Sequence, residues 1–166
     1  GERLVKSMPF IDVVVGPDNL HELPGLVREA EMGAAAAVRT VFDLDAPRFL
    51  AFDGVSSEPV GATAFVTVMK GCDERCSFCI VPYTRGPERY RPAEEIVAEV
   101  RDLVAHGARE VVLLGQTVNS YLDPTVPVAP GGDPDVSQFP SLLRRLAGEV
   151  PGLDRLRYTS PHPRHM

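Results

Sequence analysis

The 166-residue sequence has only three cysteines, no tryptophan and no long apolar run. Without a stretch of about eighteen apolar residues, a transmembrane helix is not expected. The first residues show neither the apolar core nor the cleavage site of a signal peptide. Three cysteines cannot build the disulfide framework that is typical of small secreted domains. We therefore expect a cytoplasmic protein that does not contact a membrane.

Basic residues are also scarce relative to acidic ones. The formal net charge is −6, and only two of the 17 basic residues are lysines, Lys6 and Lys70. Nucleic acids are bound mainly through Lys and Arg, so an acidic chain does not attract them as a whole. Any contact with RNA must therefore be local or lie outside this chain. The hydrophobic content of 44% is ordinary for a globular protein and argues against wholesale disorder.

All three cysteines lie in one short stretch. Cys72, Cys76 and Cys79 have the spacing Cys-x3-Cys-x2-Cys, and the aromatic Phe78 precedes the last of them. Cysteine thiolates are the usual ligands of iron–sulfur clusters, and three of them would leave one iron of a cubane open to a substrate or cofactor. The missing fourth cysteine argues against a simple electron carrier. Two alternatives stay open, thiols without a ligand and a zinc site completed by histidines. The histidines available for such a zinc site are His106, His162 and His165.

Apolar periodicity places the cysteine stretch within an alternation of strands and helices. Strands are predicted at 61–69, 110–114 and 153–158, and helices at 91–106 and 139–150. The proline- and glycine-rich segment 122–136 is predicted to be a loop. The cysteines follow directly on the first of these strands. In parallel α/β folds the functional site lies at the carboxyl ends of the strands, so the pattern predicts an α/β fold with the cysteines at that end.

A separate strand and helix precede this region. The run 11–15 is apolar and ends at Gly16 and Pro17, which predicts a buried strand. A helical pattern follows and ends at Gly33, with Pro24 placed to split it or to lie in its first turn. Residues 34–60 mix apolar residues with aspartate, proline and glycine, and we interpret them as a linker with little regular structure.

The cysteine spacing with an aromatic residue before the last cysteine is the radical S-adenosylmethionine (SAM) motif. The surrounding residues resemble the methylthiotransferases of that superfamily, and within them the tRNA-2-methylthio-N6-dimethylallyladenosine synthase (MiaB) branch. The resemblance covers nearly the whole chain. The stretches that carry it are 71–79, 80–86, 91–92, 113–121 and 158–163.

This resemblance implies a domain organisation. Residues 61–166 would be the N-terminal part of a radical SAM domain, a partial βα barrel of about three βα units. Residues 1–33 would be the C-terminal tail of an α/β N-terminal methylthiotransferase domain, with 34–60 as the linker. A second [4Fe-4S] cluster would belong only to the full-length protein. We expect the chain to be a fragment that is incomplete for activity.

The resemblance also implies the site residues. Cys72, Cys76 and Cys79 would hold a [4Fe-4S] cluster whose fourth iron binds SAM through its amino and carboxylate groups. Gly115 and Gln116 stand where radical SAM proteins hold the methionine end of SAM. Phe78 would shield the cluster.

The implied reaction adds a methylthio group to C2 of N6-(dimethylallyl)adenosine beside the tRNA anticodon. The implied partners are tRNA, bound largely through parts outside this chain, and a reductant protein such as flavodoxin or ferredoxin; we expect a monomer. Two alternatives remain for the function. One is a methylthiotransferase acting on another tRNA adenosine or on a ribosomal protein, and the other is a non-catalytic iron–sulfur or zinc module.

Overall fold

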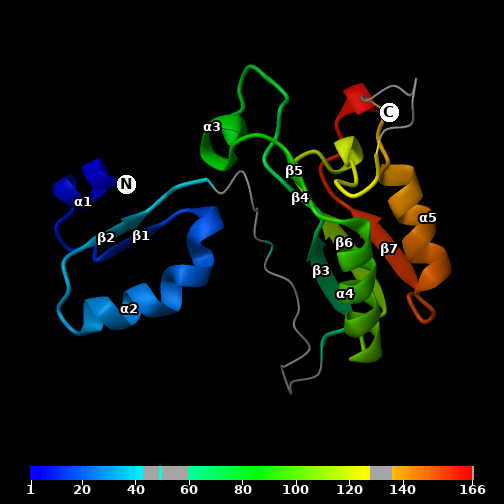
Figure 1. Ribbon diagram of the computed structural model, residues 1–166, viewed down its shortest axis with the longest axis horizontal. Helices are drawn as coiled ribbons and strands as arrows, with labels where there is room; N and C mark the ends of the chain where they lie inside the picture. The colour runs from blue at the N-terminus through cyan, green and yellow to red at the C-terminus, as the bar shows by residue number, and fades with distance from the viewer. Residues whose placement is uncertain (43–48, 50–59, 128–135, 166) are drawn as a thin grey trace. The chain divides into compact units, whose positions relative to one another are not determined.

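The computed structural model describes residues 1–42, 49, 60–127 and 136–165. The chain forms two compact units, Gly1–Leu50 and Ala51–Met166 (Figure 1). No helix within the described ranges combines the length and the apolarity that crossing a bilayer needs.

The first unit is a small βα arrangement. Strands β1 (Val13–Val15) and β2 (Ala37–Arg39) are parallel, with Val13 opposite Ala37. Between them lie the 3₁₀-helix η1 (Pro17–Glu22) and the helix α2 (Leu23–Glu31), and the short helix α1 (Glu2–Ser7) precedes β1. The predicted strand and helix are therefore confirmed, but β1 is only partly buried, so the expectation of a buried strand is wrong. Pro24 lies in the first turn of α2, where its missing N–H would have no helical partner in any case.

The segment 34–60 differs from its interpretation. Residues 37–39 form β2, so the expectation of little regular structure is wrong for them. Three residues are too few for an alternating pattern to be recognised, and the strand is defined by its pairing with β1. Residues 43–48 and 50–59 of this segment lie outside the described residues.

The second unit contains a parallel sheet. Among its described residues, β3 (Thr63–Thr67), β6 (Glu110–Leu114) and β7 (Arg155–Tyr158) are arranged in the order β3-β6-β7. In the register, Val66 is opposite Leu113, and Leu113 is opposite Tyr158. Helix α4 (Ala93–Ala105) precedes β6, and helix α5 (Phe139–Glu149) precedes β7. The predicted α/β class and the parallel sheet are therefore confirmed.

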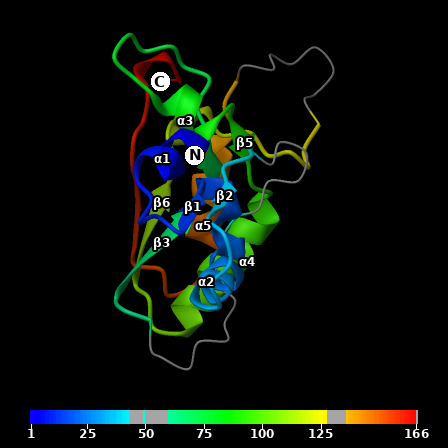
Figure 2. The ribbon, with the colours of Figure 1, turned by 90° about the vertical axis from the view of Figure 1, so that its left-hand side faces the viewer.

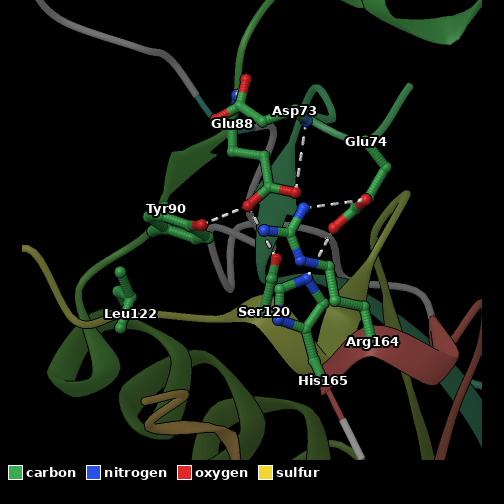
Figure 3. Close-up of a pocket in the computed structure, with 8 residues that line it drawn as sticks. All are labelled: Asp73, Glu74, Glu88, Tyr90, Ser120, Leu122, Arg164 and His165. Carbon is green, nitrogen blue, oxygen red and sulfur yellow. Dashed lines mark hydrogen bonds and ion pairs between the residues drawn. The ribbon is translucent and has the colours of Figure 1, made fainter. Parts of the chain in front are cut away.

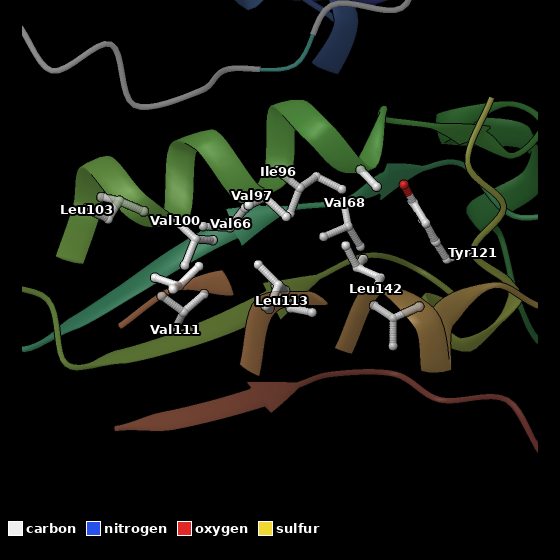
Figure 4. Packing of buried hydrophobic residues seen from close by; sticks show 14 of the residues in the cluster. Val66, Val68, Ile96, Val97, Val100, Leu103, Val111, Leu113, Tyr121 and Leu142 are labelled. Carbon is white, nitrogen blue, oxygen red and sulfur yellow. The ribbon is translucent and has the colours of Figure 1, made fainter. Parts of the chain in front are cut away.

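One face of this sheet carries the core, which Figure 4 shows between α4 and the strands. The two helices pack against each other and against the inward side chains of the strands. Each fully buried aliphatic side chain contributes about 1.5–3 kcal/mol to stability. On the opposite face of β3, Phe65 is 66% exposed. The fully buried aliphatic side chains of this core include Val66, Ile96, Val97, Val100, Val111, Leu113, Leu142 and Leu146.

The start of α4 is fixed by buried polar contacts. The guanidinium of Arg91 forms a buried ion pair with Glu99. The hydroxyl of Tyr121 donates to the Arg91 carbonyl at 2.6 Å, and Asp123 Oδ2 accepts from the Ala93 amide at 3.3 Å. These contacts tie α4 to the loop that follows β6, so the two elements next to the predicted site hold each other in place.

A short ribbon that the sequence did not predict follows β3. Strands β4 (Met69–Lys70) and β5 (Arg89–Tyr90) are antiparallel and close the segment 71–88, which we call the cysteine loop. The loop contains the helix α3 (Val81–Arg85). Beyond β6 and β7 come the 3₁₀-helices η2 (Val118–Ser120) and η3 (Pro163–His165). Figures 1 and 2 both show α3 and η3 beyond the carboxyl ends of the strands.

Candidate functional site

The cysteine loop is closed tightly at its base. Gly71 has φ of 77°, and a Cβ added there would lie 1.9 Å from the carbonyl oxygen of Pro87. The amide of Cys72 donates to the Gly86 carbonyl at 3.1 Å. Asp73 and Glu88 add two further bonds, because each side-chain carboxylate accepts from the backbone N–H of the other residue, at 3.3–3.4 Å. This base holds the first cysteine directly beyond β4.

The three cysteines lie on this one loop, as predicted, and none forms a disulfide. Cys72 is buried, whereas Cys76 and Cys79 are partly exposed. The Cys79 amide donates to the Cys76 carbonyl at 3.0 Å, so these two residues are joined by a tight turn. Three free thiols on one loop are the donor set that a cluster with one open iron requires.

Two hydrogen-bonding groups reach the thiols from the neighbouring strand ends. Thr117, which follows β6, places its hydroxyl 3.0 Å from Cys72 Sγ. His162, which follows β7, places Nε2 3.7 Å from Cys76 Sγ. Sequence patterns did not indicate Thr117 as a site residue, and they suggested His162 only as a zinc ligand. Both contacts depend on the register of the sheet, which periodicity does not determine.

Asn119 holds His162 in this position. Its side-chain nitrogen donates to the His162 carbonyl at 2.8 Å, and its oxygen accepts from the His162 amide at 2.7 Å. Asn119 is itself buried. The turn after β6 therefore carries both the hydroxyl beside Cys72 and the support for the imidazole beside Cys76.

Gly115 and Gln116 lie directly after β6, as the sequence predicted. The oxygen Oε1 of Gln116 is buried and has no hydrogen-bond partner within the part of the chain that the structure describes. A buried carbonyl oxygen without a donor is costly, and it suits a ligand that supplies an N–H group, such as an ammonium. A Cβ added at Gly115 would lie 2.5 Å from Met69 Cγ, so any larger residue would require the buried Met69 side chain to move. These residues, with the three thiols, fit a cluster with SAM on it.

A pocket of about 410 Å³ opens beside the first part of the cysteine loop (Figure 3). Glu88 is its central acceptor, because Ser120 donates to it at 2.7 Å and the hydroxyl of Tyr90 also donates to it. Burial, and next the hydrogen bond to Glu88, raise the pKa of Tyr90 above its usual range. The phenol therefore stays protonated and remains a donor. The residues that line the pocket are Asp73, Glu74, Glu88, Tyr90, Ser120, Leu122, Arg164 and His165.

Glu74, between the first two cysteines, contacts three basic side chains. His165 Nε2 lies 2.9 Å from Glu74 Oε1, Arg164 Nη1 lies 3.6 Å from Oε2, and His162 Nδ1 lies 4.0 Å from Oε1. Burial alone would raise the pKa of Glu74, but the hydrogen bond from His165 and the nearby positive charges outweigh burial and lower the pKa. Figure 3 shows Arg164 and His165 pointing into the pocket toward Glu74. The segment after β7 is thereby tied to the cysteine loop by charge.

Two other residues named from the sequence are His106, which lies away from the cysteines, and Phe78, which lies on the cysteine loop with an exposed side chain. His106 caps the carboxyl end of α4, and its Nδ1 lies 2.7 Å from the Asp102 carbonyl oxygen. This end of α4 leads into the amino end of β6, whereas the cysteines follow the carboxyl end of β3 and the short strand β4. A zinc site that combines His106 with the cysteines is therefore wrong. Phe78 is 91% exposed and does not pack in the core, and its role in shielding a cluster stays a prediction.

Comparison with known proteins identifies the superfamily to which the chain belongs. Residues 66–165, more than half of the chain, match the Radical SAM superfamily, and the chain belongs to that superfamily. Membership implies a [4Fe-4S] cluster and SAM as the cofactors of the domain.

Comparison with individual proteins shows which members of the superfamily the chain resembles. The chain is 67% identical, over its whole length, to a tRNA-2-methylthio-N(6)-dimethylallyladenosine synthase of Sorangium cellulosum, and it covers 35% of that protein. It is 44% identical, again over its whole length, to the Bordetella petrii synthase of the same name, of which it covers 33%. The chain thus spans about a third of the length of the curated relatives that it matches.

A solved structure supports the fold. The radical SAM methyltransferase TsrM from Kitasatospora setae, with tryptophan substrate and the SAM analogue aza-SAM bound, has a TM-score of 0.50 and 18% sequence identity. The similarity covers 93% of this chain and 33% of TsrM. The parallel sheet with helices on one face is therefore part of a radical SAM fold, and the partial barrel predicted from the sequence agrees with it.

Proposed function

We propose that this chain carries the SAM-cleaving site of an enzyme that adds a methylthio group to C2 of N6-(dimethylallyl)adenosine next to the tRNA anticodon. The observation that carries the proposal is the set of three free cysteines on one loop, at the carboxyl end of β3 in a radical SAM domain. The 67% identity to a synthase with this substrate in its name supports the choice of reaction.

Each residue of the site has a separate proposed role. Cys72, Cys76 and Cys79 would hold the [4Fe-4S] cluster. The Gln116 oxygen would accept a hydrogen bond from the amino group of SAM, and Gly115 would keep the backbone close to β4. When bound, the cluster and SAM supply the one-electron cleavage of SAM and the hydrogen abstraction that starts the reaction. The protein's own part is to orient SAM and to limit the access of water.

The proposal includes the wider organisation. Residues 61–166 would be the N-terminal part of the radical SAM domain, consistent with the family match beginning at residue 66. Residues 1–33 would be the tail of an N-terminal methylthiotransferase domain, with 34–60 connecting the two. A reductant protein such as flavodoxin or ferredoxin would supply the electron to a monomer in the cytoplasm, where thiols stay reduced.

Anaerobic reconstitution with iron and sulfide, followed by EPR of the reduced protein with and without SAM, tests the SAM-binding cluster on which this function depends. We expect a [4Fe-4S] signal that changes when SAM is added. Cys76→Ala should lose the signal, because it removes one of three ligands. Ser77→Ala, a change of similar size in the same loop, should keep both the signal and its response to SAM.

The same experiment distinguishes the proposed SAM-cleaving site from a non-catalytic metal module. His162 Nε2 lies 3.7 Å from Cys76 Sγ, a separation that two ligands of one zinc ion also have. A protein that takes up zinc in preference to iron, or whose cluster does not respond to SAM, would contradict the proposal. It would instead support a non-catalytic metal module.

A further inference from the structure

Two of the three cysteine sulfurs have a hydrogen-bonding side chain aimed at them. We propose that Thr117 and His162 donate hydrogen bonds to the thiolates of Cys72 and Cys76, and that these two bonds raise the reduction potential of the cluster. The inference rests on the proposed cluster, and it assigns to the chain its own means of setting how readily that cluster accepts an electron.

The direction of the first bond follows from the chemistry of the ligand. A cysteine that binds iron is a thiolate and carries no proton. At 3.0 Å from Cys72 Sγ, the Thr117 hydroxyl can therefore only donate. Thr117 is 1% exposed and Cys72 is buried, so water does not compete for this bond. A hydrogen bond to a charged group is also stronger in such surroundings than in water.

The direction of the second bond follows from the partners of the imidazole. The amide of Arg164 donates to His162 Nδ1 at 3.3 Å, so the proton of the neutral ring lies on Nε2. If the ring were instead protonated, Nε2 would still carry a proton. In either state Nε2 is the atom that lies 3.7 Å from Cys76 Sγ, and a thiolate there can only accept.

The position of His162 beside Cys76 is held by hydrogen bonds with a neighbouring side chain. Asn119 fixes the backbone of His162 with two hydrogen bonds, at 2.7 and 2.8 Å. Glu74, His162 and His165 together have the composition of a divalent-cation site. However, His162 Nδ1 already accepts from Arg164, and the Arg164 guanidinium lies 3.6 Å from Glu74. Both contacts oppose a cation, so His162 is better explained as a donor to sulfur.

Hydrogen bonds to the sulfurs of a cluster are among the main determinants of its potential. Reduction adds negative charge that is shared by the thiolates, so a donor stabilises the reduced state more than the oxidised state. Removing a donor should therefore lower the potential. We expect about a tenfold change in the ratio of reduced to oxidised cluster for each donor, which is about 59 mV for a one-electron couple.

The test is an EPR-monitored redox titration of the reconstituted protein. Thr117→Val keeps the shape of the side chain and removes its hydroxyl, and His162→Leu removes the imidazole. Each should lower the midpoint potential, and the two together should lower it further. Thr117→Ser and His162→Gln retain a donor and should remain close to the wild-type protein. His165→Gln alters a neighbouring imidazole that contacts Glu74, and it should leave the potential unchanged.

A second measurement detects the protons themselves. Electron–nuclear double resonance on the reduced cluster should show exchangeable proton couplings that disappear in deuterated water. One coupling should be absent from Thr117→Val and another from His162→Leu. A substitution that only loosens the structure would not remove one coupling and leave the other in place.

The outcomes separate this inference from the proposed function. A cluster that responds to SAM but keeps its potential and its proton couplings in both variants would overturn the inference and leave the function standing. If the wild-type protein formed no cluster, both would be overturned. A lowered potential in His165→Gln as large as that in His162→Leu would show a general effect of charge, which also contradicts the inference.

Discussion

The backbone at Gly71 adopts a conformation that other residues avoid. Its φ is 77°, and the space where a Cβ would lie is taken by the Pro87 carbonyl. Gly71→Ala should therefore destabilise the protein by about 1–3 kcal/mol through backbone strain, and by more if the base of the cysteine loop must open. Denaturant titration should show the loss of stability, and iron analysis after reconstitution should show fewer clusters per chain.

Gly148 supplies the matched control. It lies in α5, and a Cβ added there would meet nothing within 4 Å. Gly148→Ala should stabilise the protein by about 0.5–1 kcal/mol, because alanine loses less conformational entropy in a helix. Equal effects of the two substitutions would show that the strain at Gly71 does not matter.

Among single residues, the sequence predicted those that belong to a recognisable local pattern. The cysteine spacing and the position of Gly115 after a strand could be predicted, because both are local patterns. Thr117 could not be predicted, since a threonine after a strand has no special meaning until the fold places it 3.0 Å from Cys72. Phe78 was expected to shield the cluster. Its side chain is 91% exposed, so no other residue of the described chain packs over it.

Among the elements, the turn η2 connects the two donors. Asn119 lies in η2 and holds the backbone of His162, so its side chain acts on Cys76 only through that histidine. Asn119→Ala should lower the midpoint potential in the same direction as His162→Leu. In the double variant Asn119→Ala/His162→Leu, the two shifts in midpoint potential should not add, because both substitutions remove the same contact between His162 and Cys76. Additive shifts in the double variant would mean that Asn119 affects the cluster by another route.

Long elements with a clear period could be predicted, and short ones could not. The strand β6 has the predicted bounds, and α4 and α5 differ from their predictions by only one or two residues. Strands β4 and β5 contain two residues each, too few to show a period. They form because the two segments that flank the cysteine loop lie side by side, and this proximity is set by tertiary structure rather than by local sequence.

On the scale of the whole chain, the core and the metal ligands are largely separate. The hydrophobic cluster between the sheet and the helices contains none of the cysteines. Chelation of iron should therefore leave the helices and the parallel sheet intact, unlike zinc fingers, which unfold without metal. Far-UV circular dichroism should change little, while the absorption of the cluster is lost. Cooperative loss of helix on chelation would show that the cluster is required for folding.

The ribbon of β4 and β5 holds the two ends of the cysteine loop together by backbone pairing. By pairing Lys70 with Arg89, it closes the cysteine loop with backbone hydrogen bonds that need no metal. The entropy of loop closure grows by only about 0.6 kcal/mol for each doubling of loop length, and here that cost is met during folding. Iron then has to order only the short spans between the cysteines. We therefore expect the chain to fold first and to receive its cluster afterwards, on cysteines that the fold has already brought onto one closed loop.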